Sequence, residues 1–237
     1  MYATVCVNHT LPLRDVSNQW ISAIFSTEYR FKAGQYLVYQ GDLQNKIYII
    51  LDGWAHTHKL FEDGRRQIVN FVLPGNMIGL EIDDDKINYT VEAVTDIRLL
   101  GIEKSLFWEK INANPLLLLQ ILKKRERHQR VLEKRIIVLT SANSFNSMAQ
   151  MLYLLYSRLI SVGIPENEAK FFPINQILLS EVLGISYIHA HRIFNKLEKM
   201  NLVTKKNQCI QLVDVEGLLK VSYEGLDIKK PKSKLFG

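Results

Sequence analysis

The sequence predicts an α+β protein in which an antiparallel β-roll precedes a long helix and a winged helix-turn-helix. Three observations support this fold class. Short runs rich in Val, Ile, Tyr and Phe alternate with glycines over residues 29–102, helical periodicity follows over 115–140, and two short helical patterns meet at Gly184 within residues 173–198. This change in periodicity indicates that a sheet-forming part is followed by a helical part.

The roll is predicted from the turns that separate its short strands. A short helix over residues 15–25 leads into it, and glycine-containing turns then recur along the chain. Such a series of strands and tight turns is typical of an antiparallel barrel or roll. The turn sequences are Ala33-Gly34, Gln40-Gly41-Asp42, Asp52-Gly53, Asp63-Gly64 and Pro74-Gly75-Asn76.

The long helix has two interpretations. Pro115 suits its first turn, and its stripe at heptad spacing is apolar at both ends and polar in the middle, which is typical of an imperfect dimer seam. Alternatively the helix packs on its own domain and exposes a basic face. The seam residues are Leu118, Ile121, Arg125, His128, Leu132 and Leu139.

Changes in composition divide the chain into four regions. Cap-type residues at 141–144 end the long helix, and the boundary is placed at Asn143. The predicted regions are a roll domain at 1–112, the long helix and hinge at 113–142, a winged helix-turn-helix at 143–225 and a basic tail at 226–237.

The helix-turn-helix is predicted from two short amphipathic patterns. Gly184 suits the turn between them, Ser186 suits the N-cap of the second helix, and a hairpin over residues 202–212 would form a wing. The alternative is a helical hairpin with a solvated polar face. The apolar positions that face inward are Leu179, Leu183, Ile185, Ile193 and Leu197.

Composition and charge say less about the fold and function than the motifs do. The 237 residues carry 30 Lys and Arg against 24 Asp and Glu, a formal charge of +6, which suits a polyanion partner without requiring one. No secretion signal or long apolar run is present, so we expect a soluble, cytoplasmic protein with no membrane partner. Cys6 and Cys209 are far apart and are expected to be free thiols.

Several motifs together resemble the Crp/Fnr superfamily of bacterial transcription regulators. They lie at residues 31–42, 47–53, 63–69 and 73–79 and at the helix-turn-helix, and the 63–79 region resembles the Fnr and FixK side most. The resemblance implies a roll like a cyclic-nucleotide-binding jelly roll, and a homodimer joined through the long helix. It also implies two recognition helices about 34 Å apart on palindromic double-stranded DNA, with RNA polymerase as a further expected partner.

The effector implied by the resemblance is unknown. The positions that match the Arg-Ser pair of cyclic-nucleotide binders hold Ile87 and Asn88, so cyclic AMP is not expected, because a buried phosphate needs a cation or helix-terminus donors. Cys6 alone does not resemble the N-terminal cysteine cluster of iron–sulfur members, and no cofactor is expected. The candidate effector pocket is Gly79, Glu81, Asn88, Tyr89, His128 and Leu132.

The recognition helix departs from the common family pattern. Arg192 keeps the position that resembles a guanine-reading arginine, whereas Tyr187 and Ile188 replace the usual Arg and Glu, so the preferred DNA site should differ from the common one. The predicted DNA contacts are Ser186, Tyr187, Ile188, His189, His191, Arg192, Asn195, Lys196, Lys205 and Lys206.

A competing interpretation is a metal-dependent barrel enzyme. His56, His58 and Glu62 resemble the metal-binding motif of cupins, since the two imidazoles share one strand face. However, the gap between Gly53 and His56 is short, and the histidine of the second cupin motif is missing after residues 74–75. Paired histidines on an exposed strand face are therefore preferred, with no metal site and no catalytic residues.

Overall fold

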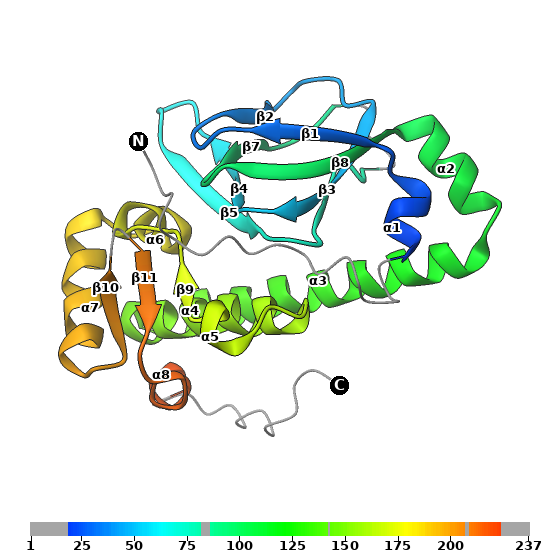
Figure 1. The fold of residues 1–237 in the computed structure, drawn as a ribbon. Coiled ribbons are helices and arrows are strands. Elements are labelled where there is room, and N and C mark those ends of the chain that lie inside the picture. The colour runs from blue at the N-terminus through cyan, green and yellow to red at the C-terminus, as the bar shows by residue number, and fades with distance from the viewer. Residues whose placement is uncertain (1–18, 82–85, 142, 207–208, 224–237) are drawn as a thin grey trace. The chain divides into compact units, whose positions relative to one another are not determined.

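The computed structural model describes residues 19–81, 86–141, 143–206 and 209–223 (Figure 1). The predicted basic tail and Cys6 lie outside these residues. The chain divides into two compact units, Met1–Arg127 and His128–Gly237. This division falls within the long helix, and the predicted domain boundary at Asn143 stays a prediction.

The first unit is an antiparallel β-roll, as predicted (Figure 1). Its two four-stranded sheets have the orders β1-β8-β3-β6 and β2-β7-β4-β5. Helix α1 (Gln19–Ile24) precedes the roll and α2 (Lys104–Asn112) follows it. The strands are β1 (Thr27–Phe31), β2 (Tyr36–Val38), β3 (Lys46–Asp52), β4 (Ala55–Leu60), β5 (Arg66–Val72), β6 (Met77–Ile78), β7 (Thr90–Ala93) and β8 (Ile97–Glu103).

The core of the roll forms where the strand pattern turns large apolar side chains inward. Trp54 and Phe71 are fully buried, with ring centroids 6.1 Å apart in an edge-on arrangement. The turn before Trp54 requires a glycine: Gly53 has a φ of +83°, and a Cβ there would overlap the carbonyl oxygen of Asp96. The glycine turns therefore position the strands, as their spacing predicts.

Helix α3 (Pro115–Ser141) begins at the predicted proline and spans both units. Ile121, a predicted seam residue, is 2% exposed and is already covered within the single chain. Other apolar side chains of the helix remain exposed, which leaves an apolar surface for a partner. They are Leu116, Leu118, Leu119, Leu122 and Ile136.

The second unit contains the predicted helix-turn-helix and wing. Asn143 caps α4 (Ser144–Ser161), whose apolar face is buried. The three-stranded sheet has the order β10-β11-β9, and β10 and β11 form the hairpin whose turn, residues 207–208, lies outside the described part. The remaining elements are α5 (Glu166–Ala169), β9 (Phe171–Phe172), α6 (Gln176–Leu183), α7 (Tyr187–Lys199), β10 (Val203–Lys206), β11 (Cys209–Leu212) and α8 (Val215–Ser222).

Two further observations concern the chain as a whole. Cys209 is buried and disulfide-bonded, so the prediction of a free thiol is wrong at this position. Among the described residues, none of the helices has the length and apolar character needed to cross a membrane.

Candidate functional site

The turn between α6 and α7 has the geometry that its sequence predicts. Gly184 ends α6 in the left-handed conformation, with φ 66° and ψ 32°, and its backbone N–H donates to the carbonyl of Ser180. Ser186 then caps α7, because its side-chain oxygen accepts from the backbone N–H of His189 at 3.3 Å. Asn175 caps α6 in the same way, so both helices begin at well-defined residues.

The packing of α7 separates its inner face from its outer face. Ala190, Ile193, Phe194 and Leu197 are buried, which confirms the predicted inner positions on this helix. Tyr187 and Ile188 lie in the first turn of α7 and are 50% and 64% exposed. A side chain exposed in this way contributes little burial to the stability of the fold. The other predicted DNA contacts on α7 are exposed, except Asn195, which is partly buried.

A hydrogen-bond chain joins α6 to the outer face of α7. Gln176 Oε1 lies 2.8 Å from His191 Nδ1, and Asn195 Nδ2 lies 3.1 Å from His191 Nε2. The amide oxygen of Gln176 accepts, so Nδ1 of His191 carries the proton and Nε2 accepts from Asn195. Gln176 could not be identified from the sequence, because its partner is fifteen residues away and no local pattern links the two.

The sides of α7 are held by aromatic and wing contacts. The rings of Tyr187 and His191 stack at 6.1 Å between centroids, and Lys196 Nζ lies 4.3 Å from the ring centroid of Phe145. In the wing, Lys205 donates its backbone N–H to Glu198 at the end of α7. Lys205 and Lys206 are both exposed on β10. The unit thus presents a polar and cationic surface along α7 and the wing.

The candidate effector region lies partly in the first unit. The hydroxyl of Tyr89 donates to Glu81 Oε1 at 2.7 Å, and burial, reinforced by the nearby Glu81 carboxylate, raises the pKa of Tyr89. Gly79 has a φ of +84°, and Asn88 is exposed. Arg125 donates to the carbonyl of Leu80 at 3.1 Å, so a cation lies close to Glu81 and Tyr89.

The remaining residues of that candidate pocket are placed differently. Leu132 belongs to the second unit and is partly buried. His128 also belongs to it, and its side chain, like that of Leu139, lies outside the described part of the structure. Within the first unit, the structure brings together Gly79, Glu81 and Tyr89 of the predicted set.

The histidine pair of the roll differs from its sequence-based interpretation. His56 and His58 are 1% and 5% exposed, so the prediction of an exposed strand face is wrong. Burial, together with the positive charge of Arg66, lowers the pKa of His56 to about 3 and that of His58 to about 4. Glu62 is exposed in the turn after β4, and the carboxylate beside the histidines belongs to Glu92.

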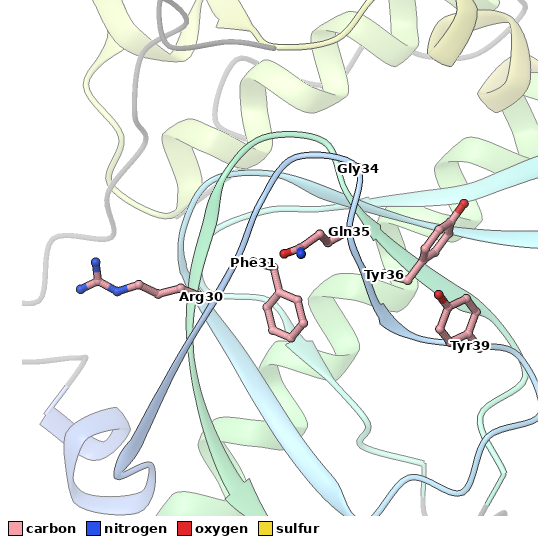
Figure 2. Close-up of a pocket in the computed structure, with 6 residues that line it drawn as sticks. All are labelled: Arg30, Phe31, Gly34, Gln35, Tyr36 and Tyr39. Atoms are coloured by element: carbon pink, nitrogen blue, oxygen red, sulfur yellow. The ribbon is translucent and has the colours of Figure 1, made fainter. Parts of the chain in front are cut away.

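An open depression lies near the β1–β2 turn of the roll (Figure 2). Its volume is about 560 Å³, and Tyr36 and Tyr39 stack at one end with centroids 5.0 Å apart. Arg30 points away at the other end in Figure 2 and forms an ion pair with Glu28. Its remaining lining residues are Phe31, Gly34 and Gln35.

Sequence profiles of known families match both units. The cyclic nucleotide-binding domain matches residues 28–114, and the Crp-like helix-turn-helix domain matches residues 148–221. The nitrogen fixation regulation protein FixK of Bradyrhizobium diazoefficiens is 25% identical over 184 residues, which cover 78% of this chain and 77% of FixK. The chain belongs to the Crp/Fnr family of transcription regulators.

Solved structures of this Crp/Fnr fold resemble the chain over most of its length. FixK2 from Bradyrhizobium japonicum has a TM-score of 0.72 at 20% identity and covers 82% of this chain and 96% of its own. A Crp/Fnr-family regulator from Thermus thermophilus has a TM-score of 0.65 at 24% identity, covering 83% and 98%. These likenesses confirm the predicted fold class.

The position that the sequence resemblance predicts to meet a cyclic phosphate is apolar and buried in this chain. Ile87, which matches the arginine of the family's Arg-Ser pair, is 1% exposed and belongs to a core cluster of the roll. An apolar side chain packed in the core offers a phosphate no donor. The comparisons also give the cupin-like enzyme no support.

Proposed function

We propose that this Crp/Fnr-family regulator binds palindromic double-stranded DNA as a homodimer, with α7 of each protomer in a major groove. The observation that supports the proposal most is the exposure of apolar and polar side chains together on the outer face of α7. The inner face of the same helix is fully packed. The first turn of a recognition helix is the part that contacts base edges in such motifs.

Each exposed side chain suits a particular contact. Arg192 can bond O6 and N7 of a guanine together, and Ile188 can pack on a thymine methyl group. Tyr187, stacked on His191, presents its hydroxyl from a fixed ring. Ser186, His189, Lys196, Lys205 and Lys206 suit phosphate contacts, which position the helix without reading sequence.

His191 and Asn195 suit an indirect role better than direct contact. Both ring nitrogens of His191 and the Nδ2 atom of Asn195 already form hydrogen bonds, so a DNA contact through a ring nitrogen of His191 would break one of them. We propose that this chain of hydrogen bonds fixes the orientation of Tyr187 and Arg192 at the groove.

Dimerisation through α3 is supported by its exposed leucines. Leu118 and Leu122 are 37% and 51% exposed one helical turn apart, and Leu116 and Leu119 extend the apolar surface. A contiguous exposed apolar patch on a helix is typical of an interaction surface. Two copies joined there would present two recognition helices to a palindrome, with RNA polymerase as a further proposed partner and the cytoplasm as the proposed location.

We propose no catalytic step, and no response to cyclic AMP. A small-molecule effector near Glu81 and Tyr89 would meet a carboxylate and the guanidinium of Arg125 together. Titration of the purified protein with cyclic AMP and cyclic GMP should leave its melting temperature unchanged. A stabilisation that grows with nucleotide concentration would contradict this part of the proposal.

Selection from random double-stranded DNA tests the proposed function. Tag-free protein is incubated with the pool at moderate salt, and bound molecules are sequenced over several rounds. We expect an inverted repeat with half-site centres one helical turn apart, about 34 Å. A pool that stays random, while the protein remains folded by circular dichroism, would contradict sequence-specific binding.

A further inference from the structure

The interior of the β-roll contains a cluster of chemically active side chains for which the regulator's fold has no evident use. His56 and His58 extend from one face of β4, and Glu92 on β7 is the direct cross-strand neighbour of His56. One ligand atom can be chosen from each of the three so that all lie within 4.8 Å of one another. Both histidines are buried and Glu92 is partly buried.

The separation of the two imidazoles is the feature that points to a ligand. His58 Nδ1 and His56 Nδ1 lie 3.3 Å apart, close enough for a hydrogen bond between the two rings in the absence of an ion. Two nitrogens that each lie about 2.05 Å from a tetrahedral zinc ion are separated by about 3.3 Å. The pair is therefore spaced as it would be around a metal ion.

The carboxylate completes a typical donor set. Glu92 Oε2 lies 3.6 Å from His56 Nε2, not from the Nδ1 atom that faces His58, and Arg66 Nη1 holds the same oxygen at 2.7 Å. One ion takes only one nitrogen of the His56 ring, so binding all three ligands needs side-chain adjustment within the 4.8 Å cluster. Ligating carboxylates in proteins are commonly oriented by such hydrogen bonds. Two imidazoles and one carboxylate with an open position suit zinc and neighbouring divalent transition metals rather than calcium or magnesium, which prefer oxygen ligands.

We propose that His56, His58 and Glu92 bind one divalent transition-metal ion inside the β-roll. Imidazole ligates metals in its neutral form, through whichever ring nitrogen carries no proton. The positive charge of Arg66 repels a bound metal ion. The affinity for that ion therefore depends on all three ligands binding it together. The site is independent of the proposed DNA-binding function, since it lies in the first unit and is measured without DNA.

Cobalt titration tests the proposal on the full-length, tag-free protein. Co²⁺ is added to chelator-treated protein, and the visible absorption of four-coordinate cobalt is followed. We expect one equivalent per chain, and loss of the band when Zn²⁺ displaces cobalt. Absence of a visible band at saturating micromolar cobalt would overturn the proposal.

Two Glu→Gln variants distinguish the cluster in the structure, which contains Glu92, from the motif expected from the sequence, which contains Glu62. Glu92→Gln should weaken cobalt binding at least tenfold, as loss of a ligand contact does, whereas Glu62→Gln should leave it unchanged because Glu62 is exposed outside the cluster. His58→Gln should abolish the band. Equal binding by wild type and the His56→Gln, His58→Gln double variant would overturn the proposal.

The buried histidine variants risk misfolding, so a second measurement uses the unaltered chain. X-ray absorption at the zinc edge of the one-to-one complex should show scattering from two imidazoles. A zinc shell without imidazole scattering would overturn the assignment. Operator binding is measured separately, so failure of the DNA proposal and failure of the metal proposal give different results.

Discussion

Gln176 at the start of α6 lies 2.8 Å from the Nδ1 atom of His191 on α7, and so joins the two helices of the DNA-binding motif on its outer side. The bond does not contribute to the buried core, which is complete on the inner face. Its consequence is orientational, because His191 in turn stacks on Tyr187 and accepts from Asn195.

Removing either Gln176 or His191 should weaken DNA binding, because the residue that remains loses the contact that fixes its orientation. Gln176→Ala and His191→Ala should each weaken operator affinity, and the double variant should lose less than the sum, with a coupling of about 0.5–1.5 kcal/mol. Fluorescence anisotropy with the DNA duplex obtained by selection measures the affinity of the wild type, the two single variants and the double variant. Strictly additive losses would show that the bond does not orient the helix.

Arg192 should determine one guanine of the half-site. Arg192→Ala should cost about 1–3 kcal/mol on the operator and flatten base preference at that position. Arg192→Lys keeps the charge but loses the bidentate geometry, so it should also relax specificity. Arg65→Ala, which removes an exposed arginine in the roll, is the control and should not change affinity. Unchanged base preference in Arg192→Ala would exclude Arg192 from base reading.

Ile188 should recognise a thymine by its methyl group. Replacing that thymine by uracil removes the methyl alone, and should weaken wild-type binding about fourfold, equivalent to ~0.8 kcal/mol. Ile188→Ala should bind both duplexes alike. If no thymine-to-uracil change in the half-site affects the wild type, the proposed contact does not exist.

The exposed leucines of α3 should control assembly. Leu118→Lys with Leu122→Lys should shift the protein from dimer to monomer in sedimentation velocity, because charged side chains would be buried at the seam. Leu43→Lys alters a leucine that is 73% exposed in the roll and should leave the dimer intact. A double variant that stays dimeric would place the interface elsewhere.

Lys124 on α3 should make stability depend on pH in the alkaline range. Burial lowers its pKa to about 8 in the folded chain, from 10.5. Between these values the unfolded chain holds a proton that the folded chain has released, so stability rises with pH across the window. Urea unfolding at pH 8 and pH 10 measures this rise, and Lys124→Met should diminish it. The same rise in both proteins would assign it to other groups.

The fold could be predicted from the sequence because its signals are local. Glycine turns, the proline at the start of α3 and the caps at Asn143 and Ser186 act within a few residues, and the structure has each of them in place. The inner face of α7 follows from helical periodicity in the same way.

The contacts within the sites could not be predicted, because they depend on strand register and helix crossing. Local spacing suggested Glu62 as the partner of the histidines, whereas pairing of β4 with β7 brings Glu92 to His56. The guanidinium of Arg125, a predicted seam residue, also bonds to the carbonyl of Leu80, a contact that the sequence does not indicate. Such partners are distant in sequence and leave no periodic signal.

Half-site spacing tests most directly whether two copies of α7 bind one DNA site together. Affinity is compared between the selected palindrome and the same half-sites with about five base pairs inserted, which turns one half-site to the opposite face of the duplex. We predict a loss of about a hundredfold or more, because one recognition helix of the dimer could no longer reach its groove. Equal affinity for the two duplexes would contradict the account.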